Sequence, residues 1–233
     1  MEVKVLLSQD LIPKFYRNYA LSLVKEAIKL GNKAVYIRLY ETEKVVEKKP
    51  FNFEIFFKGT PTGDFYLVDK KPILKFSTTN GEILSAFIKG VLVLSKRGYE
   101  FYISEHLKDK VKPKLLGMEK KIISNTLFIP NFLLPESAKD FKEKTKGMRL
   151  EEKVKFYFES QGFKVLEILR LKQKRPVKHK FRDIILMVNP IELEIKVSAE
   201  SKDKLLDAVY NGIGWFSSQG FGYIKPVLRA VKV

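Results

Sequence analysis

Apolar and polar residues alternate in four runs of the first half of the chain, a pattern typical of half-buried strands. The runs are EVKVLL at residues 2–7, FNFEIFF at 51–57, DFYLVDKKPILKFST at 64–78 and YEFYIS at 99–104. Within the third run, Lys70-Lys71-Pro72 indicates a turn. We therefore expect a strand at each of these four places.

Two segments between these runs repeat apolar residues every three or four positions, as amphipathic helices do. We expect the first helix to begin at Pro13 and to end at Gly31-Asn32. Its apolar stripe is formed by Tyr19, Leu23, Val24, Ala27 and Ile28. The second helix is GEILSAFIKGVLV at residues 81–93. Between the first helix and FNFEIFF lies a variable stretch, through Tyr36, Arg38 and Tyr40 to the basic EKKP, to which we assign no helix or strand.

The same order of elements recurs in the second half. We expect strands at KIISNTLFIP, FKVLEILRL, DIILMVNPIELEIKV and GFGYIKPVLRAVKV, and helices at RLEEKVKFYFESQG and SKDKLLDAVYNGI. The order β-α-β-β-α-β is that of the ferredoxin-like unit. The sequence thus predicts an α+β fold of two tandem ferredoxin-like units, residues 1–112 and 113–233, joined in the basic segment KDKVKPKLLG.

The chain carries a net charge of +17 and contains no Cys. Such a charge favours a polyanionic partner, and we place nucleic acid ahead of an anionic membrane because Lys89 interrupts the longest apolar run. The absence of Cys excludes disulfides and thiolate metal sites, and favours a cytoplasmic protein. With two His and no tight group of carboxylates, we expect no metal and no cofactor.

Four glycines form two Gly-x-Gly pairs in NGIGWFSSQGFGYIKP at residues 211–226. The segment follows a predicted helix and precedes a predicted strand, whereas dinucleotide and Walker loops run from strand to helix. A binding site for ATP or a dinucleotide is therefore excluded. Two interpretations remain: the backbone amides form a nest for phosphates, or the glycines only turn a helix sharply into a strand.

The spacing of these glycines resembles the C-terminal glycine-rich loop of the RAMP superfamily. Within it, GIGWFSSQGFGYI after DKLLDAVYN is most similar to the CRISPR repeat-processing endoribonucleases. The resemblance covers essentially the whole chain and implies two tandem ferredoxin-like folds. It also implies metal-independent cleavage of pre-crRNA within repeats, in which the 2′-OH attacks and leaves 2′,3′-cyclic phosphate and 5′-OH ends. The implied partners are CRISPR repeat RNA and a CRISPR effector complex, with the protein a monomer or homodimer.

Many of these relatives use a His just after the first helix as general acid or base, but this chain has only His106 and His179. By the resemblance, the family's His falls near Tyr40, its Lys near Lys49, and a Tyr of some relatives at Lys25. We therefore expect Lys25, Tyr40 and Lys49 to be catalytic, a Lys shuttling protons and Tyr40 donating to the leaving oxygen. The alternative for the lysines is a solvated basic face.

The segment LKQKRPVKHKFRD is rich in cations, and in the resembling fold this hairpin grips RNA. We expect His106 to be structural. The expected RNA-binding residues are cations of this hairpin and of the first helix region, together with residues of the glycine-rich loop: Lys29, Arg38, Lys172, Lys174, Arg175, Lys178, His179, Lys180, Arg182, Gly212, Gly214, Ser217, Ser218, Gly220 and Gly222.

Two departures from the family leave alternatives open. Relatives often have a basic residue between the glycine pairs, where this chain has Trp215 and Phe216, which could stack on a base or pack on the protein. The missing His motivates a non-catalytic repeat-RNA-binding relative or effector-complex subunit. A third hypothesis is a general binder of single-stranded RNA, although FNFEIFF is only superficially similar to an RNP motif.

Overall fold

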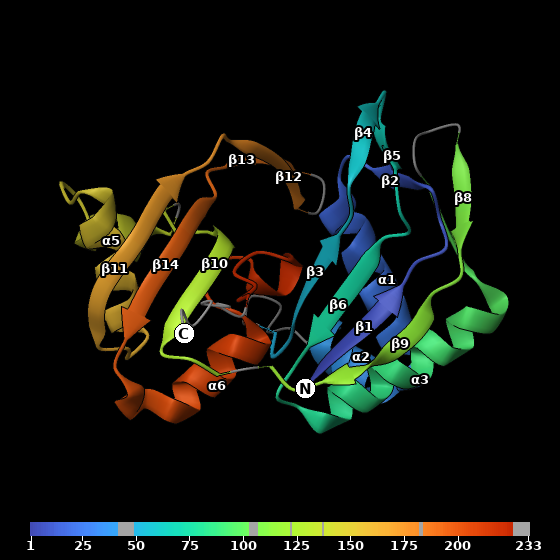
Figure 1. Cartoon of the computed structure of the whole chain (residues 1–233), viewed down its shortest axis with the longest axis horizontal. Helices are drawn as coiled ribbons and strands as arrows, with labels where there is room; N and C mark the ends of the chain where they lie inside the picture. The colour runs from blue at the N-terminus through green and yellow to red at the C-terminus, as the bar shows by residue number, and fades with distance from the viewer. Residues whose placement is uncertain (42–48, 103–106, 122, 137, 182–183, 226–233) are drawn as a thin grey trace, which may run out of the picture. The chain divides into compact units, whose positions relative to one another are not determined.

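The computed structural model describes residues 1–41, 49–102, 107–121, 123–136, 138–181 and 184–225. The chain divides into two compact units (Figure 1): Met1–Lys120 with Ser218–Gly220, and Lys121–Ser217 with Phe221–Val233. We had expected the division between residues 112 and 113. The first unit extends further because the strand β9, Lys114–Glu119, pairs with the N-terminal strand.

The first unit contains a four-stranded antiparallel sheet in the order β3-β6-β1-β9. Its other strands are β1 (Glu2–Leu6), β3 (Asn52–Phe56) and β6 (Ile73–Ser77). Because α1 (Tyr16–Gly31) follows β1 and α3 (Gly81–Arg97) follows β6, the order of elements is β-α-β-β-α-β. This is the predicted ferredoxin-like unit.

Three local expectations for this unit were wrong. The fourth strand of the sheet is β9 rather than YEFYIS, because β7 (Tyr99–Tyr102) pairs with its neighbour β8 (Lys108–Val111) instead. Pro13 does not open a helix, since it ends the strand β2 (Leu11–Pro13). That strand belongs to a small sheet of order β2-β5-β4, with β4 (Gly59–Thr62) and β5 (Phe65–Val68).

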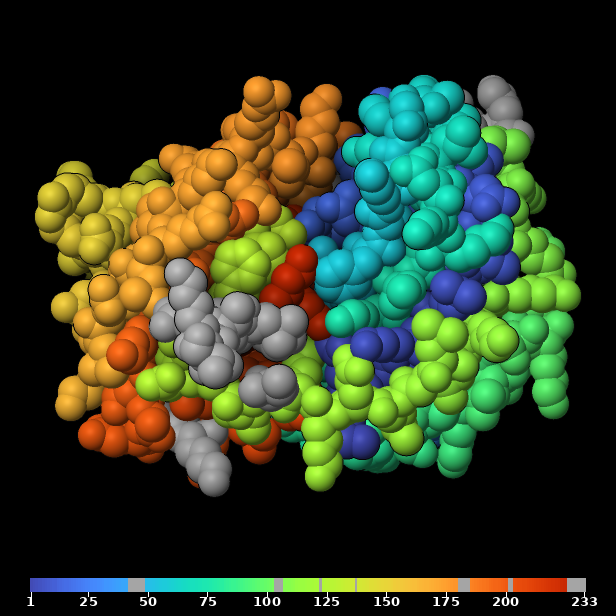
Figure 2. Space-filling view, in the orientation of Figure 1, coloured from blue at the N-terminus to red at the C-terminus, as the bar shows by residue number. Residues whose placement is uncertain are grey.

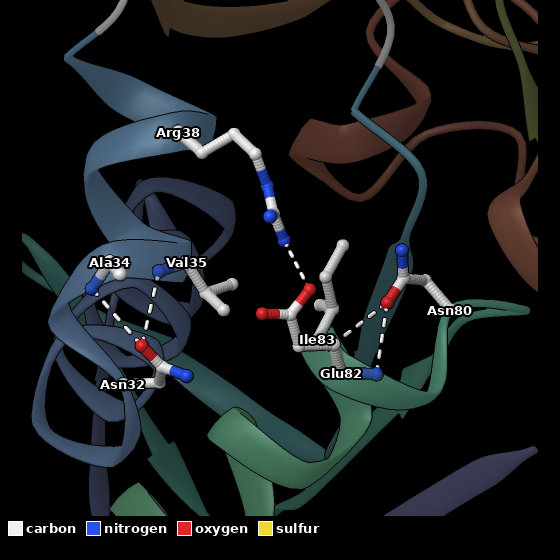
Figure 3. A network of polar contacts seen from close by, with 7 residues as sticks. All are labelled: Asn32, Ala34, Val35, Arg38, Asn80, Glu82 and Ile83. Carbon is white, nitrogen blue, oxygen red and sulfur yellow. Dashed lines mark hydrogen bonds and ion pairs between the residues drawn. The ribbon is translucent and has the colours of Figure 1, made fainter.

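The third correction is a helix, α2 (Lys33–Tyr40), in the stretch to which we assigned no helix or strand. The side chain of Asn32 accepts hydrogen bonds from the backbone N–H groups of Ala34 and Val35, at 3.0 and 3.2 Å (Figure 3). This cap satisfies two amides that the first turn leaves unpaired. Val35 and Leu39, four residues apart, are the buried residues of α2.

The helices α1 and α3 of the first unit cross so closely that their backbones are in contact. A Cβ atom placed on Gly31 would lie 1.8 Å from the carbonyl oxygen of Ala86, and one placed on Gly90 would lie 1.7 Å from that of Ala27. Only glycine fits at both positions, because any side chain would overlap the backbone of the other helix.

The second unit has a three-stranded sheet of order β10-β14-β11, formed by β10 (Thr126–Phe132), β11 (Val165–Gln173) and β14 (Ile191–Val197). Its helices are α4 (Lys139–Lys144), α5 (Leu150–Ser160) and α6 (Lys202–Asn211), with short 3-10 turns at Ala199–Ser201 and Ser217–Gln219.

The predicted closing strand lies mostly outside the described residues. Lys225 forms an antiparallel bridge with Phe128 on the free edge of β10, which is the place of the fourth strand in a ferredoxin-like sheet. Both units therefore have the predicted topology, and the α+β fold class is confirmed.

The remaining strands, β12 (Val177–Phe181) and β13 (Ile184–Val188), form an antiparallel hairpin in the basic segment. Figure 2 shows this hairpin in orange at the surface, and the side chains of Lys178, Ile185 and Met187 are exposed there. Among the described residues, no helix is long and apolar enough to cross a membrane.

The crossing of α1 and α3 can be tested by adding one methyl group. We expect Gly90→Ala to lower the free energy of unfolding by roughly 3 kcal/mol, because the methyl group overlaps the Ala27 carbonyl. Urea denaturation followed by circular dichroism measures the change. Gly81→Ala is the matched control in the same helix: nothing lies within 4 Å of its added Cβ, so the stability should be unchanged or should rise by up to about 1 kcal/mol. Equal stability of both variants would contradict the close crossing.

Candidate functional site

Three residues that we expected to be catalytic lie together in the first unit. Lys25 lies on α1, Tyr40 is the last residue of α2, and Lys49 precedes β3. The Lys25 Nζ atom lies 4.8 Å from the centroid of the Tyr40 ring, and the Lys49 Nζ atom lies 5.4 Å from it. Two ammonium groups therefore share one aromatic ring, although the catalytic roles of these residues stay a prediction.

The electrostatics of this group favour loss of a proton from one lysine. Burial, followed by the charge of Lys49, lowers the pKa of Lys25 below its ordinary value. Two like charges near one ring repel, and loss of one proton relieves the repulsion. The neutral form of a Lys can accept a proton from a substrate.

The Tyr40 hydroxyl is less suited to the donor role that we expected. Its Oη atom is buried and has no hydrogen-bond partner among the described residues. Burial, followed by interaction with Tyr36, raises the pKa of Tyr40 well above its usual range. The ring of Tyr40, rather than its hydroxyl, contacts the lysines.

Tyr36, which we did not expect to have a role, belongs to the same arrangement. Lys29 Nζ lies 5.6 Å from the centroid of the Tyr36 ring, and the rings of Tyr36 and Tyr40 are 5.1 Å apart. Lys25 and Lys29 are four residues apart on α1, and so are Tyr36 and Tyr40 on α2. Each pair therefore lies on one face of its helix. Lysines of α1 thus meet tyrosines of α2 in two layers. The spacings K-x-x-x-K and Y-x-x-x-Y are the signal that could have indicated this.

Arg38, expected to bind RNA, forms an ion pair within the protein. Its guanidinium contacts Glu82 Oε2 at 2.5 Å, and both side chains are exposed (Figure 3). Glu82 lies in the first turn of α3, where the side chain of Asn80 caps the helix. A phosphate at this place would compete with the Glu82 carboxylate for Arg38.

In the second unit, His179 points into an apolar cluster rather than to solvent. Its side chain is 3% exposed, and its ring centroid lies 5.3 Å from that of Phe216 and 5.2 Å from that of Phe221. Although we expected His179 to bind RNA, this placement leaves it little surface for a ligand. Lys178, next to it on β12, alternates to the exposed face.

The other expected cations of this region differ in their surroundings. Lys172 and Arg175 are exposed. Lys174 is half-buried, donates to Asn131 Oδ1 at 3.2 Å and lies 4.0 Å from a carboxylate oxygen of Glu192. The Lys180 side chain, Arg182 and His106 lie outside the described residues.

Several backbone amides of the glycine-rich loop donate hydrogen bonds within the protein. The amides of Gly212, Trp215 and Gly222 donate to the carbonyl oxygens of residues 208, 133 and 131, at 2.9, 2.9 and 2.8 Å. The glycines at 212, 214, 220 and 222 all have positive φ. These amides are not available to a phosphate, which favours the interpretation of the glycines as a turn.

Residues between the glycine pairs pack on the protein. The rings of Trp215 and Phe216 stack at 4.2 Å, and both pack against the cluster of Leu133, Val188 and Phe221. Ser217 is buried and Ser218 is half-buried. The packing interpretation therefore holds for both aromatic rings.

Metal ligands are not grouped in the part of the chain that the structure describes. There, no three residues among His, Asp and Glu lie close enough to hold a metal ion. The candidate site of the first unit consists of amines and aromatic rings.

The architecture is similar to that of several solved CRISPR-associated proteins. A Cas6 protein is 20% identical, with a TM-score of 0.57, over 97% of this chain and 99% of that chain. The product of a Cas6-related gene from Pyrococcus furiosus is 19% identical, with a TM-score of 0.61, over 96% of each chain. A RAMP protein that binds different RNA substrates is 18% identical, with a TM-score of 0.60, over 96% of this chain and 97% of that chain.

These similarities confirm, at the level of the fold, the resemblance found in the sequence. No protein-family model matches the chain, and no curated protein matches it. The chain shares its fold with Cas6 and RAMP proteins over almost its whole length.

The turn interpretation of the glycine-rich loop predicts a large loss of stability at Gly222. A Cβ atom there would lie 1.7 Å from the Ile213 carbonyl oxygen, so we expect Gly222→Ala to cost roughly 3 kcal/mol or more of unfolding free energy. Gly147→Ala is the matched control, because its φ is also positive but nothing lies within 4 Å of the added Cβ. It should cost about 1 kcal/mol, from the backbone conformation alone. Similar losses in both variants would contradict the turn interpretation.

The different surroundings of Lys178 and His179 predict different effects on RNA binding. We expect Lys178→Ala to weaken binding of single-stranded RNA roughly threefold to tenfold. The slope of log affinity against log salt concentration should fall by about 1, the value for one phosphate contact. His179→Leu should leave the affinity nearly unchanged and lower the melting temperature. Fluorescence anisotropy at several salt concentrations measures binding. If folded His179→Leu lost affinity and Lys178→Ala did not, His179 rather than Lys178 would be the RNA contact.

Proposed function

We propose that this protein is an endoribonuclease that binds CRISPR repeat RNA and cleaves it without a metal ion. The observation that carries the proposal is the convergence of Lys25 and Lys49 on the ring of Tyr40. The fold shared with Cas6 proteins and the net charge of +17 support RNA as the substrate.

The proposed reaction is an intramolecular attack on the scissile phosphate. The 2′-oxygen forms a bond to phosphorus, and the bond from phosphorus to the 5′-oxygen breaks. The neutral amine of Lys25 accepts the 2′-OH proton, and the ammonium of Lys49 gives a proton to the leaving 5′-oxygen. The products are a 2′,3′-cyclic phosphate and a 5′-OH, and proton exchange with solvent restores the two lysines.

Positive charge near the phosphate serves the transition state as well as binding. The phosphorane carries more negative charge than the ground state, so an ammonium at this place stabilises the transition state preferentially. The exposed cations Lys172, Arg175 and Lys178 lie in the second unit and would hold the RNA backbone. Holding the chain so that the 2′-oxygen and the leaving oxygen are in line supplies a further part of the rate.

The test is a single-turnover cleavage assay with end-labelled repeat RNA in EDTA. We expect one cut, blocked by a 2′-deoxy substitution at the cleaved nucleotide. Lys25→Ala and Lys49→Ala should each lower the rate by roughly 10²-fold or more, because each removes a proton-transfer group. Lys33→Ala is the matched control: it removes an exposed lysine from the first turn of α2 and should keep the rate.

Two outcomes would contradict the proposal. Cutting that resists the 2′-deoxy substitution would exclude the 2′-OH as nucleophile. Salt-dependent binding of repeat RNA by folded protein without any cut would favour the non-catalytic alternative, which the missing His motivates.

A further inference from the structure

The most unusual polar group of the candidate site is the Tyr40 side chain. Its hydroxyl is buried without a hydrogen-bond partner among the described residues, while its ring faces the ammonium groups of Lys25 and Lys49. A buried, unpaired hydroxyl costs free energy, so this position must be stabilised by other contacts of the ring.

We propose that Tyr40 is a positioning residue whose ring holds the side chains of Lys25 and Lys49 beside each other, and whose hydroxyl takes no part in proton transfer. The proposal rests on the proposed function, since it assigns the role of one residue in that reaction. It replaces the donor role that the sequence suggested for Tyr40.

The charged forms of Lys25 and Lys49 repel each other. Two flexible lysine side chains near the same place tend to separate, because the repulsion between their charged forms and their side-chain entropy both favour separation. The face of an aromatic ring carries partial negative charge and attracts a cation within about 6 Å of its centroid. Both Nζ atoms lie within that distance, at 4.8 and 5.4 Å.

The surroundings fix the ring itself. Tyr40 packs against Tyr36 one helical turn earlier, with ring centroids 5.1 Å apart. Tyr40 also packs against the apolar core of the first unit. A ring held in this way fixes the two amines, whereas a free lysine samples many rotamers.

The Tyr40 hydroxyl, unlike the ring, is poorly placed to act in the reaction. A proton donor must come within hydrogen-bond distance of the leaving oxygen, directly or through one water molecule. The Oη atom is buried. The ring can therefore act through the two lysines without any contact between the hydroxyl and the substrate.

The proposal distinguishes the ring from the hydroxyl, and two substitutions separate them. Tyr40→Phe keeps the ring, so we expect cleavage close to the wild-type rate at saturating RNA. Tyr40→Leu removes the ring, and we expect the rate to fall by about 10²-fold, with the affinity for uncleavable 2′-deoxy RNA nearly unchanged. Tyr102→Leu is the matched control: Lys108 Nζ lies 4.7 Å from the ring centroid of this exposed residue, and the cleavage rate should not change.

A spectroscopic measurement on the protein alone tests the same contacts. A methylene group over the face of an aromatic ring shows an upfield ring-current shift, so the Hε signals of Lys25 and Lys49 should be shifted upfield. We expect the shifts to persist in Tyr40→Phe and to disappear in Tyr40→Leu. Loss of one signal in Lys25→Ala, and of another in Lys49→Ala, assigns them.

Each outcome decides the proposal. A Tyr40→Phe variant as slow as Tyr40→Leu would show that the hydroxyl acts, and unshifted lysine signals in the wild type would show that the ring does not hold the amines; either overturns it. If the wild type binds RNA and does not cut, the proposed function fails, while the spectra still test the ring contacts. If Tyr40→Leu does not fold, Tyr40→Phe and the wild-type spectra remain decisive.

Discussion

The close crossing of α1 and α3 is the constraint on which the first unit depends. With glycine at Gly31 and Gly90, the two helices approach until backbone meets backbone. This contact fixes α1 beside α3, and α1 in turn carries Lys25 and Lys29. Because α1 is a regular helix, burying one of its faces against the core also decides which direction the face with Lys25 and Lys29 points. Packing in the core therefore determines where the chemical groups of the candidate site lie.

The reaction proposed at Tyr40 needs few groups. Lysine is a poor base while it is solvated, and it becomes useful when burial and a neighbouring charge disfavour its ammonium form. In the proposed role, the ring of Tyr40 keeps the two lysine side chains beside each other without adding an acid or a base. In this respect the site differs from one built on His, which titrates near neutral pH without such help.

The periodic pattern of apolar residues predicted the helices and strands that have one buried and one exposed face. It missed elements whose apolar pattern is weak. The strands β1 and β14 and the helices α1, α3 and α5 follow clear periods. The helix α2 depends on the cap by Asn32 and on only two buried residues, so its pattern is weak. The strand β9 exposes Leu116 and Met118 at the edge of its sheet, and its alternation is hidden.

The candidate site was predictable only in part, for a related reason. The family resemblance indicated Lys25, Tyr40 and Lys49. It compares single positions with those of relatives, whereas the helix and strand periods do not link these three residues. The ion pair of Arg38 with Glu82 and the burial of His179 depend on tertiary contacts, which a single sequence does not contain. A cation in a sequence is only a candidate for RNA binding until its neighbours are known.

Asn32 has a consequence for how the chain can vary. Its backbone N–H closes the last turn of α1 by donating to the Ile28 carbonyl, and its side chain opens α2, so a single residue forms the whole corner between the two helices. One inserted residue at this corner would turn α2 by about 100° about its own axis. The tyrosines would then face away from the lysines while both helices stayed intact. Loop length at this corner is thus as much a part of the site as the identity of its residues.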